Sequence, residues 1–108
     1  MGISAIMGIA VSGTQAQTTL LSAAANNVAN ALTPGYDRAV TTFSSRALGG
    51  VSASVSPSGN PTPPGGSNVD LANELVDAMG AELGFKANAS VFETGADLWD
   101  VLMSIKRD

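Results

Sequence analysis

The chain has 108 residues, with nine acids, five bases, no histidine and no cysteine. A chain of this length forms at most one small domain. Without histidine or cysteine it has no Ser-His or Cys-His nucleophile system, no disulfide and no imidazole or thiolate metal site. Only 5% of its residues are aromatic, so a monomer would have a marginal core, and assembly with other copies is expected.

Charge is distributed unevenly along the chain. Residues 1–36 contain no charged side chain, whereas residues 68–108 hold eight of the nine acids and three of the five bases. A long helix without charge is expected to contact protein on most sides. The acidic half argues against nucleic acid, which requires clustered Lys or Arg. The amino-terminal apolar run is shorter than the ~20 residues of a membrane span and lacks a basic region, so neither membrane insertion nor a cleaved signal is expected.

The first predicted element is a helix over residues 3–31. One row of its side chains alternates spacings of four and three residues, as in a coiled-coil seam, and a second row lies beside it. Small residues in the first row favour close approach of another helix, and two rows predict two packing surfaces. The first row is Ile6, Ala10, Gly13, Gln17, Leu20, Ala24, Asn27 and Ala31, and the second is Met7, Val11, Thr14, Thr18, Leu21, Ala25, Val28 and Leu32.

This helix is expected to end in a fixed turn. Asn26, Asn27 and Asn30 have low helix propensity, so their amides are expected to bond to specific partners. They precede Thr33-Pro34-Gly35-Tyr36. Proline disfavours the α region for the residue before it, and glycine permits a positive φ, which together predict a type II turn.

Two short strands and a linker follow the turn. Residues 39–46 are rich in Val, Thr and Phe, and residues 51–55 alternate apolar side chains with serines, so a hairpin with Gly49-Gly50 in its turn is predicted. An isolated hairpin is marginal in water and needs a packing partner, with Phe43 as the expected anchor. Residues 56–67, SPSGNPTPPGGS, have the composition of a loose linker.

The second predicted helix covers residues 68–108. Ser67 or Asn68 can cap its amino terminus, and Lys106 and Arg107 place positive charge in its last turn. Its apolar stripe has a mean spacing of about 3.67 residues, which predicts little left-handed supercoiling. The helix also contains glycines at positions 80, 84 and 95, each of which costs roughly 1 kcal/mol in a helix interior. The stripe is Ala72, Val76, Met79, Leu83, Ala87, Val91, Gly95, Leu98, Leu102 and Ile105.

Three aromatic side chains, Phe85, Phe92 and Trp99, recur every seven residues beside this stripe. Core packing is the simpler interpretation, and docking into a neighbouring subunit is the alternative. Acids also repeat on successive turns, and such clusters can hold a hard cation. A solvated face accounts for them, so no metal, cofactor or enzymatic activity is expected.

Two stretches of the sequence resemble the bacterial flagellar axial proteins, the rod and hook family. Residues 25–36 read A-N-N-V-A-N-x-x-T-P-G-Y, similar to the family's amino-terminal motif. Residues 67–89 read S-N-V-D-L-A-x-E-x-V and then F-x-A-N-A, similar to its carboxy-terminal helix. The short middle resembles a proximal-rod protein. The family motif residues are Asn26, Asn27, Asn30, Thr33, Pro34, Gly35, Tyr36, Asn68, Val69, Asp70, Leu71, Glu74, Phe85 and Asn88.

The residues and the resemblance together predict a mainly α fold. Two long terminal helices pair as a coiled-coil-like hairpin, with a short β-hairpin and a Pro/Gly linker between them. The expected divisions are a helix and turn over residues 1–36, a hairpin over 37–55, a linker over 56–67 and a helix over 68–108, the first and last forming one helical domain. The expected packing or interface residues are Leu20, Leu21, Val28, Phe43, Val76, Leu83, Phe92, Leu98, Trp99 and Leu102.

The resemblance implies a structural subunit of the flagellar basal-body rod, in the periplasmic space. Such a subunit is exported by the type III route without a cleaved signal, assembles through its terminal helices and transmits torque for motility. Its expected partners are copies of itself and other rod subunits, with the membrane ring and the export apparatus as further candidates. The alternatives are a soluble helical adaptor or export partner of flagellar subunits, and a small carboxylate-dependent enzyme or ion-binding protein.

Overall fold

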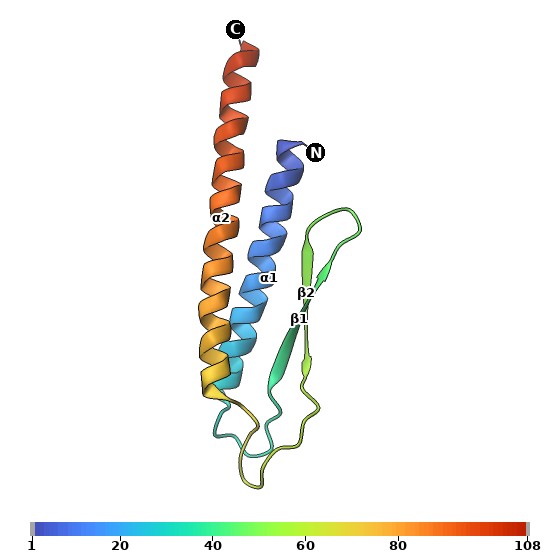
Figure 1. The fold of residues 1–108 in the computed structure, drawn as a ribbon, viewed down its shortest axis with the longest axis vertical. Coiled ribbons are helices and arrows are strands. Elements are labelled where there is room, and N and C mark those ends of the chain that lie inside the picture. Colours follow the sequence, from blue (N-terminus) through green and yellow to red (C-terminus); the bar gives the residue numbers. More distant parts are fainter. Residues whose placement is uncertain (1, 108) are drawn as a thin grey trace.

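The computed structural model describes residues 2–107 as two long antiparallel helices with a two-stranded sheet beside them (Figure 1). The elements are α1 (Ile3–Ala29), β1 (Ala39–Ser45), β2 (Val51–Pro57) and α2 (Leu71–Arg107). The predicted mainly α class, with a short hairpin between two long helices, is confirmed. The molecule is elongated, with extents of 71 × 25 × 14 Å. Neither helix, as far as it is described, has the long apolar stretch that crossing a membrane requires.

The helix α1 ends two residues before the predicted boundary. The N–H of Asn30 still bonds to Asn26 O and Asn27 O, but Asn30 O then accepts from Thr33 N at 2.9 Å and begins the turn. The Asn30 side chain donates to Asn26 O at 3.0 Å. The type II turn is present as predicted, because Tyr36 N bonds to Thr33 O at 3.2 Å and the φ of Gly35 is +76°.

The hairpin lies along α1, on the side away from α2 (Figure 1). Its strands pair antiparallel from Ala39 opposite Pro57 to Ser45 opposite Val51. The connecting loop places Gly49 and Gly50 at positive φ, which glycine adopts without strain. β2 extends two residues beyond the predicted strand, so Pro57 belongs to the sheet and not to the linker.

Small and polar side chains form the seam between α1 and α2. Ala10, Ala24 and Asn27 of the predicted first row are buried. On α2 the side chains that meet them recur every seven residues, at Glu74, Ala81, Asn88 and Gly95. Glycines on both helices receive side chains from the other helix: Asn88 packs over Gly13, Gln17 over Gly84 and Met7 over Gly95.

The predicted apolar stripe of α2 is therefore wrong for most of its length. Val76 and Leu83 are 65% and 69% exposed, and Met79, Leu102 and Ile105 are also exposed. The contacting positions follow a seven-residue repeat, not the 3.67-residue spacing. The physical reason is that helices approach closely through alanine, glycine and asparagine, while the large apolar side chains project outward.

The predicted cap of α2 is also wrong. Helix α2 begins at Leu71, and the Asp70 carboxylate accepts from Ala72 N at 3.0 Å and from Asn73 N at 3.4 Å. Asp70 is therefore the N-cap residue. Ser67 and Asn68 bond instead to other segments: Ser67 Oγ donates to Ala31 O at 2.6 Å. The Arg107 side chain, expected to add charge at the far end, lies outside the described residues.

Candidate functional site

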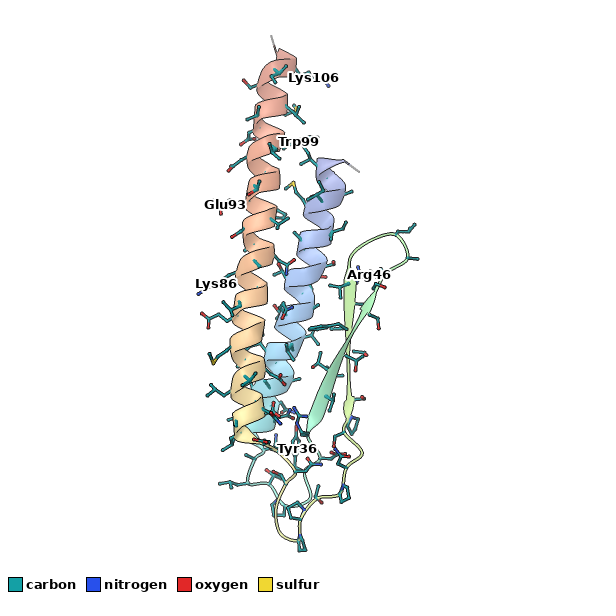
Figure 2. The ribbon with its side chains drawn as sticks, viewed as in Figure 1. Tyr36, Arg46, Lys86, Glu93, Trp99 and Lys106 are labelled. Carbon is teal, nitrogen blue, oxygen red and sulfur yellow. The ribbon has the colours of Figure 1, made fainter. Side chains whose placement is uncertain are left out.

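A buried polar cluster joins the lower ends of α1, β1 and α2. It consists of Asn27, Tyr36, Arg38 and Glu74, near the Tyr36 label of Figure 2. Tyr36 OH donates to Asn27 Oδ1 at 2.8 Å, and Asn27 Nδ2 donates to Glu74 Oε2 at 3.1 Å. Asn27 also exchanges two hydrogen bonds with the backbone of Ala39, at 2.8 and 2.9 Å. One amide thus connects the helix, the turn, the first strand and the second helix.

The carboxylate of Glu74 is almost fully buried within this cluster. Arg38 Nε donates to Glu74 Oε1 at 2.8 Å, while Arg38 Nη2 lies 3.6 Å from Asp77 Oδ2 near the surface. A buried carboxylate is tolerated when it is paired with a cation and hydrogen-bonded. Here Arg38 supplies the charge and Asn27 the second donor, so the cluster fixes how the two helices and the turn meet.

A second group of polar side chains, the loop cluster, holds residues 56–68 against the turn. It consists of Asp37, Ser58 and Asn68. Asn68 Nδ2 donates to Asp37 Oδ1 at 2.8 Å, Ser58 Oγ donates to the same oxygen, and Gly59 N donates to Asp37 Oδ2 at 2.9 Å. These hydrogen bonds, that from Asn68 foremost, hold the pKa of Asp37 below its ordinary value. Asn68 Oδ1 in turn accepts from Arg38 N at 2.6 Å.

The predicted loose linker is thus attached at several points. Besides the loop cluster, Gly35 N donates to Gly66 O at 2.9 Å, and Asn68 N donates to Tyr36 O at 3.3 Å. The composition of residues 56–67 gave no sign of this, because the partners in and after the turn lie 20 or more positions away in the chain.

The family motif residues separate into three groups. Asn27, Tyr36 and Glu74 meet in the polar cluster. Next to the cluster, Asn26 donates to Tyr36 OH at 3.1 Å, and the Thr33 hydroxyl donates to Asn30 Oδ1. Asn68 lies in the loop cluster, and Asp70 caps α2. Val69 is half-buried, and Leu71, Phe85 and Asn88 lie on α2 away from the cluster, Asn88 in the helix seam.

Sequence reasoning missed four participating residues: Arg38, Asp37, Ser58 and Ser12. Ser12 lies on a third face of α1, together with the buried Ala16 and Ala23. Its hydroxyl donates to Ile9 O at 2.6 Å and accepts from Val51 N at 3.1 Å. A serine among alanines carries no local signal of a strand docking against it, whereas the basic Arg38 directly after the turn could have suggested a carboxylate partner.

Outside these clusters, the helices expose many large apolar side chains. A groove between α1 and α2, called here the lateral groove, consists of two adjoining hollows of about 540 and 520 Å³. Leu21, Leu75 and Ala78 line both hollows, and Phe85 lines one. Of the expected packing residues, Leu20 is half-buried, while Leu21, Val28, Phe43, Val76, Leu83, Phe92, Leu98, Trp99 and Leu102 are exposed.

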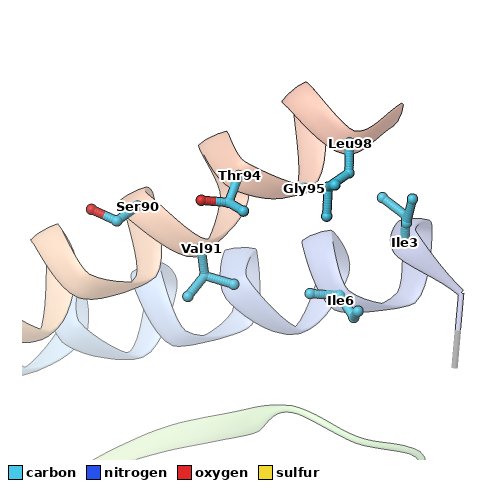
Figure 3. Close-up of a pocket in the computed structure, with 7 residues that line it drawn as sticks. All are labelled: Ile3, Ile6, Ser90, Val91, Thr94, Gly95 and Leu98. Carbon is cyan, nitrogen blue, oxygen red and sulfur yellow. The ribbon is translucent and has the colours of Figure 1, made fainter. Parts of the chain in front are cut away.

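Further hollows lie elsewhere along the helix pair. An apolar one of about 250 Å³ lies near the start of α1, where Ile3 and Ile6 face Val91, Gly95 and Leu98 of α2 (Figure 3). Another of about 360 Å³ lies between the hairpin and the helices, and polar side chains such as Arg38 and Asp77 line it together with Phe43 and Val76. Phe43 is thus directed toward the helices but remains exposed. Exposed apolar area of this extent is typical of interaction surfaces.

The acids of α2 repeat on successive turns of the helix. Across residues 2–107, no three of them come close enough together to hold a metal ion. Glu74 is committed to Arg38 and Asn27, and Glu82 pairs with Lys86 at 2.9 Å on the surface. The arrangement can therefore fix a conformation and present apolar surface.

Comparisons with known proteins agree with the amino-terminal motif. Residues 7–36 match the family described as flagella basal body rod protein. The flagellar hook protein FlgE of Brucella suis biovar 1 (strain 1330) is 49% identical over 41 residues, and that of Rhizobium meliloti (strain 1021) is 44% identical over 41 residues. Each match covers 38% of this chain and 10% of the relative. The chain therefore aligns with about a tenth of the length of these hook proteins.

Proposed function

We propose that this chain, identified by its amino-terminal segment as a flagellar axial protein of the rod and hook family, is a structural subunit of the basal-body rod. It assembles with copies of itself and with other rod subunits through its two helices. The short hairpin, which leaves no room for a large inserted domain between the helices, favours the rod over the hook.

The observation that carries this proposal is the contrast between the base of the molecule and its sides. At the base, two polar clusters, one of them built on the buried Asn27 and Glu74, connect both helices, the hairpin and residues 56–68. Along the sides, large apolar side chains of both helices remain exposed. A chain with a fixed conformation and uncovered apolar faces is suited to burying those faces against neighbours.

The same geometry supports torque transmission as part of this proposal. Paired helices that contact closely through glycine and alanine form a stiff element along a molecule that is 71 Å long. A heterologous contact that does not close on itself repeats such elements into a helical filament. In that filament the helices form the inner layer, and the turn at Pro34-Gly35 directs the chain outward to the hairpin.

Localisation tests the assignment to the rod. Basal bodies are isolated from the bacterium that encodes this chain and from a strain of it that lacks the hook protein, and both are probed with an antibody against the hairpin loop. A rod subunit is present in both preparations, and deletion of its gene abolishes motility. A chain found only where the hook is present contradicts the assignment to the rod.

The same experiment addresses the alternative of a soluble adaptor or export partner. An adaptor remains in the cell lysate and is absent from both preparations of basal bodies. Membrane-ring and export-apparatus partners are tested by cross-linking within the isolated particles, where a rod subunit next to the ring gives a product containing a ring protein.

A further inference from the structure

We propose that the lateral groove receives Trp99 from a second copy of this chain, displaced along the helix axis by three heptads. The inference rests on the proposed function, because it specifies one contact of the assembly. In each copy, the lower half of the helix pair provides the groove. The upper half of α2 provides the side chains that enter the groove of the next copy.

The two hollows of the lateral groove share three lining residues. These are Leu21 of α1 and Leu75 and Ala78 of α2, and Ala78 has the smallest side chain of the three. The total space exceeds what one indole ring occupies. The lining of the groove is largely apolar. The hairpin lies on the other side of α1, so no other element of residues 2–107 covers the groove.

The side chains proposed to enter the groove lie in the upper half of α2. Phe92 and Trp99 are 40% and 49% exposed within the protomer. They belong to one heptad row of α2, four positions after the seam residues Asn88 and Gly95. Ala78 and Phe85 belong to the same row, four positions after Glu74 and Ala81.

The heptad row fixes the register between copies. A displacement of three heptads, about 31 Å at 1.5 Å per residue, places Trp99 of one copy at the level of Ala78 in the next. It also places Phe92 at the level of Leu71. A large side chain then faces the small side chain of Ala78, which is the knob-into-hole arrangement that sustains helix packing.

Charge supports this register. Lys106 is the next member of the row after Trp99, and Figure 2 shows it on the side of α2 along which α1 runs. The same displacement places it at the level of Phe85, beside Glu82 on the groove wall. Residues 70–86 hold four acids and one base, Lys86, which pairs with Glu82, so an incoming lysine meets a surface that is negative on balance.

Disulfide trapping tests the contact, since the chain has no cysteine of its own. Thr18 lies on the groove wall, and Met103 lies one turn above Trp99. Within one chain Gln17 packs on Gly84 of the antiparallel helix, so position 18 is level with position 83 and about 30 Å from position 103 along α2, far beyond disulfide reach. A double variant with T18C and M103C is therefore expected to form a ladder of disulfide-linked oligomers on oxidation. The matched control combines T18C with D97C. Asp97 lies in the same row as the outward Val76 and Leu83, so this control is expected to form no ladder.

The single tryptophan gives an independent readout on the unmodified chain. Its emission maximum is expected to shift to the blue as particles form, because the indole leaves water. W99A is expected to raise the concentration needed for assembly by about tenfold or more, as for an interface anchor, and W99F by much less. Particles without a ladder and without a blue shift overturn this contact but leave the proposed function standing. Absence of particles at any concentration overturns both.

Discussion

The side-chain amide of Asn27 makes four hydrogen bonds to three other segments, all of them at least nine positions away in the chain. Replacement by alanine leaves the backbone N–H of Ala39 and one oxygen of Glu74 without these partners. Asn27→Ala is therefore expected to lower the free energy of unfolding by about 1–3 kcal/mol. Urea denaturation followed by circular dichroism measures the change.

The neighbouring Asn26 is the matched control for this variant. It is exposed and donates one hydrogen bond, to Tyr36 OH at 3.1 Å. Asn26→Ala is expected to change the free energy of unfolding by no more than about 0.5 kcal/mol. Equal effects of the two substitutions contradict the central position given to Asn27.

The loop cluster predicts a pH dependence with a definite sign. The pKa of Asp37 in the folded chain is lower than its ordinary value of 3.8 because Asn68, Ser58 and Gly59 donate to the carboxylate. Its contribution to stability is therefore complete above the unfolded-state pKa and is lost as the pH falls through the folded-state pKa. The stability advantage of the natural chain over Asp37→Asn is expected to be constant at neutral pH and to shrink below about pH 4. An advantage independent of pH contradicts the ionised state of the cluster.

At the residue scale, the sequence predicted the turn and the fact that Asn27 has specific partners, but not which residues those partners are. The turn at Thr33-Pro34-Gly35-Tyr36 was predictable because proline and glycine restrict φ locally. The bonding of Asn27 was predictable in kind, since an asparagine within a helix usually has a specific partner. The identity of its partners was not, because Glu74 and Ala39 come close only through the fold. The pairing of Asp37 with Ser58 has the same long-range origin.

At the scale of the helices, glycine has opposite effects at two positions. A methyl group at Gly13 collides with the short Asn88 side chain, whereas nothing lies within 4 Å of a methyl group at Gly80. Gly13→Ala is expected to destabilise the chain by about 1–3 kcal/mol through overpacking. Gly80→Ala is expected to stabilise it by up to about 1 kcal/mol through helix propensity. Thermal and urea unfolding of the two variants measure both changes.

The two outcomes depend on different physical causes, so they can fail separately. A stabilising Gly13→Ala shows that the helices do not approach closely at this position. A destabilising Gly80→Ala shows that Gly80 is itself covered, which in a protomer with an open surface there points to contact with another subunit.

The existence of both helices followed from sequence pattern, but the inner face of α2 did not. Hydrophobic periodicity selects the rows with the largest apolar side chains, and in α2 those rows face outward. The true seam contains Glu74, Ala81 and Asn88, whose small size or polarity hides them from a hydrophobic pattern, and it meets the predicted stripe at Gly95. The first row of α1 was predicted correctly because alanine and glycine there lined up with the few larger side chains. Two of the α2 glycines, Gly84 and Gly95, are places where α1 side chains fit, although the sequence shows them only as a cost in helix propensity.

At the scale of the whole molecule, stability and assembly are coupled. The buried apolar side chains of the described residues are all alanines, so each protomer gains little from its own core. The missing hydrophobic stabilisation comes from neighbours, against which Leu21, Phe92, Trp99 and the outward stripe of α2 are buried. The low aromatic content and the uncharged first 36 residues indicated this dependence on assembly, whereas the surfaces involved required the fold.

Helicity and particle mass, measured together over a concentration series, test the central claim most directly. Circular dichroism follows the helix content of the purified chain, and light scattering follows its mass. A structural subunit that completes its fold in the assembly is a monomer with incomplete helix content at low concentration and gains helix as large particles appear. A fully helical monomer or dimer whose mass does not change with concentration contradicts this account, because its two helices then satisfy each other without neighbours.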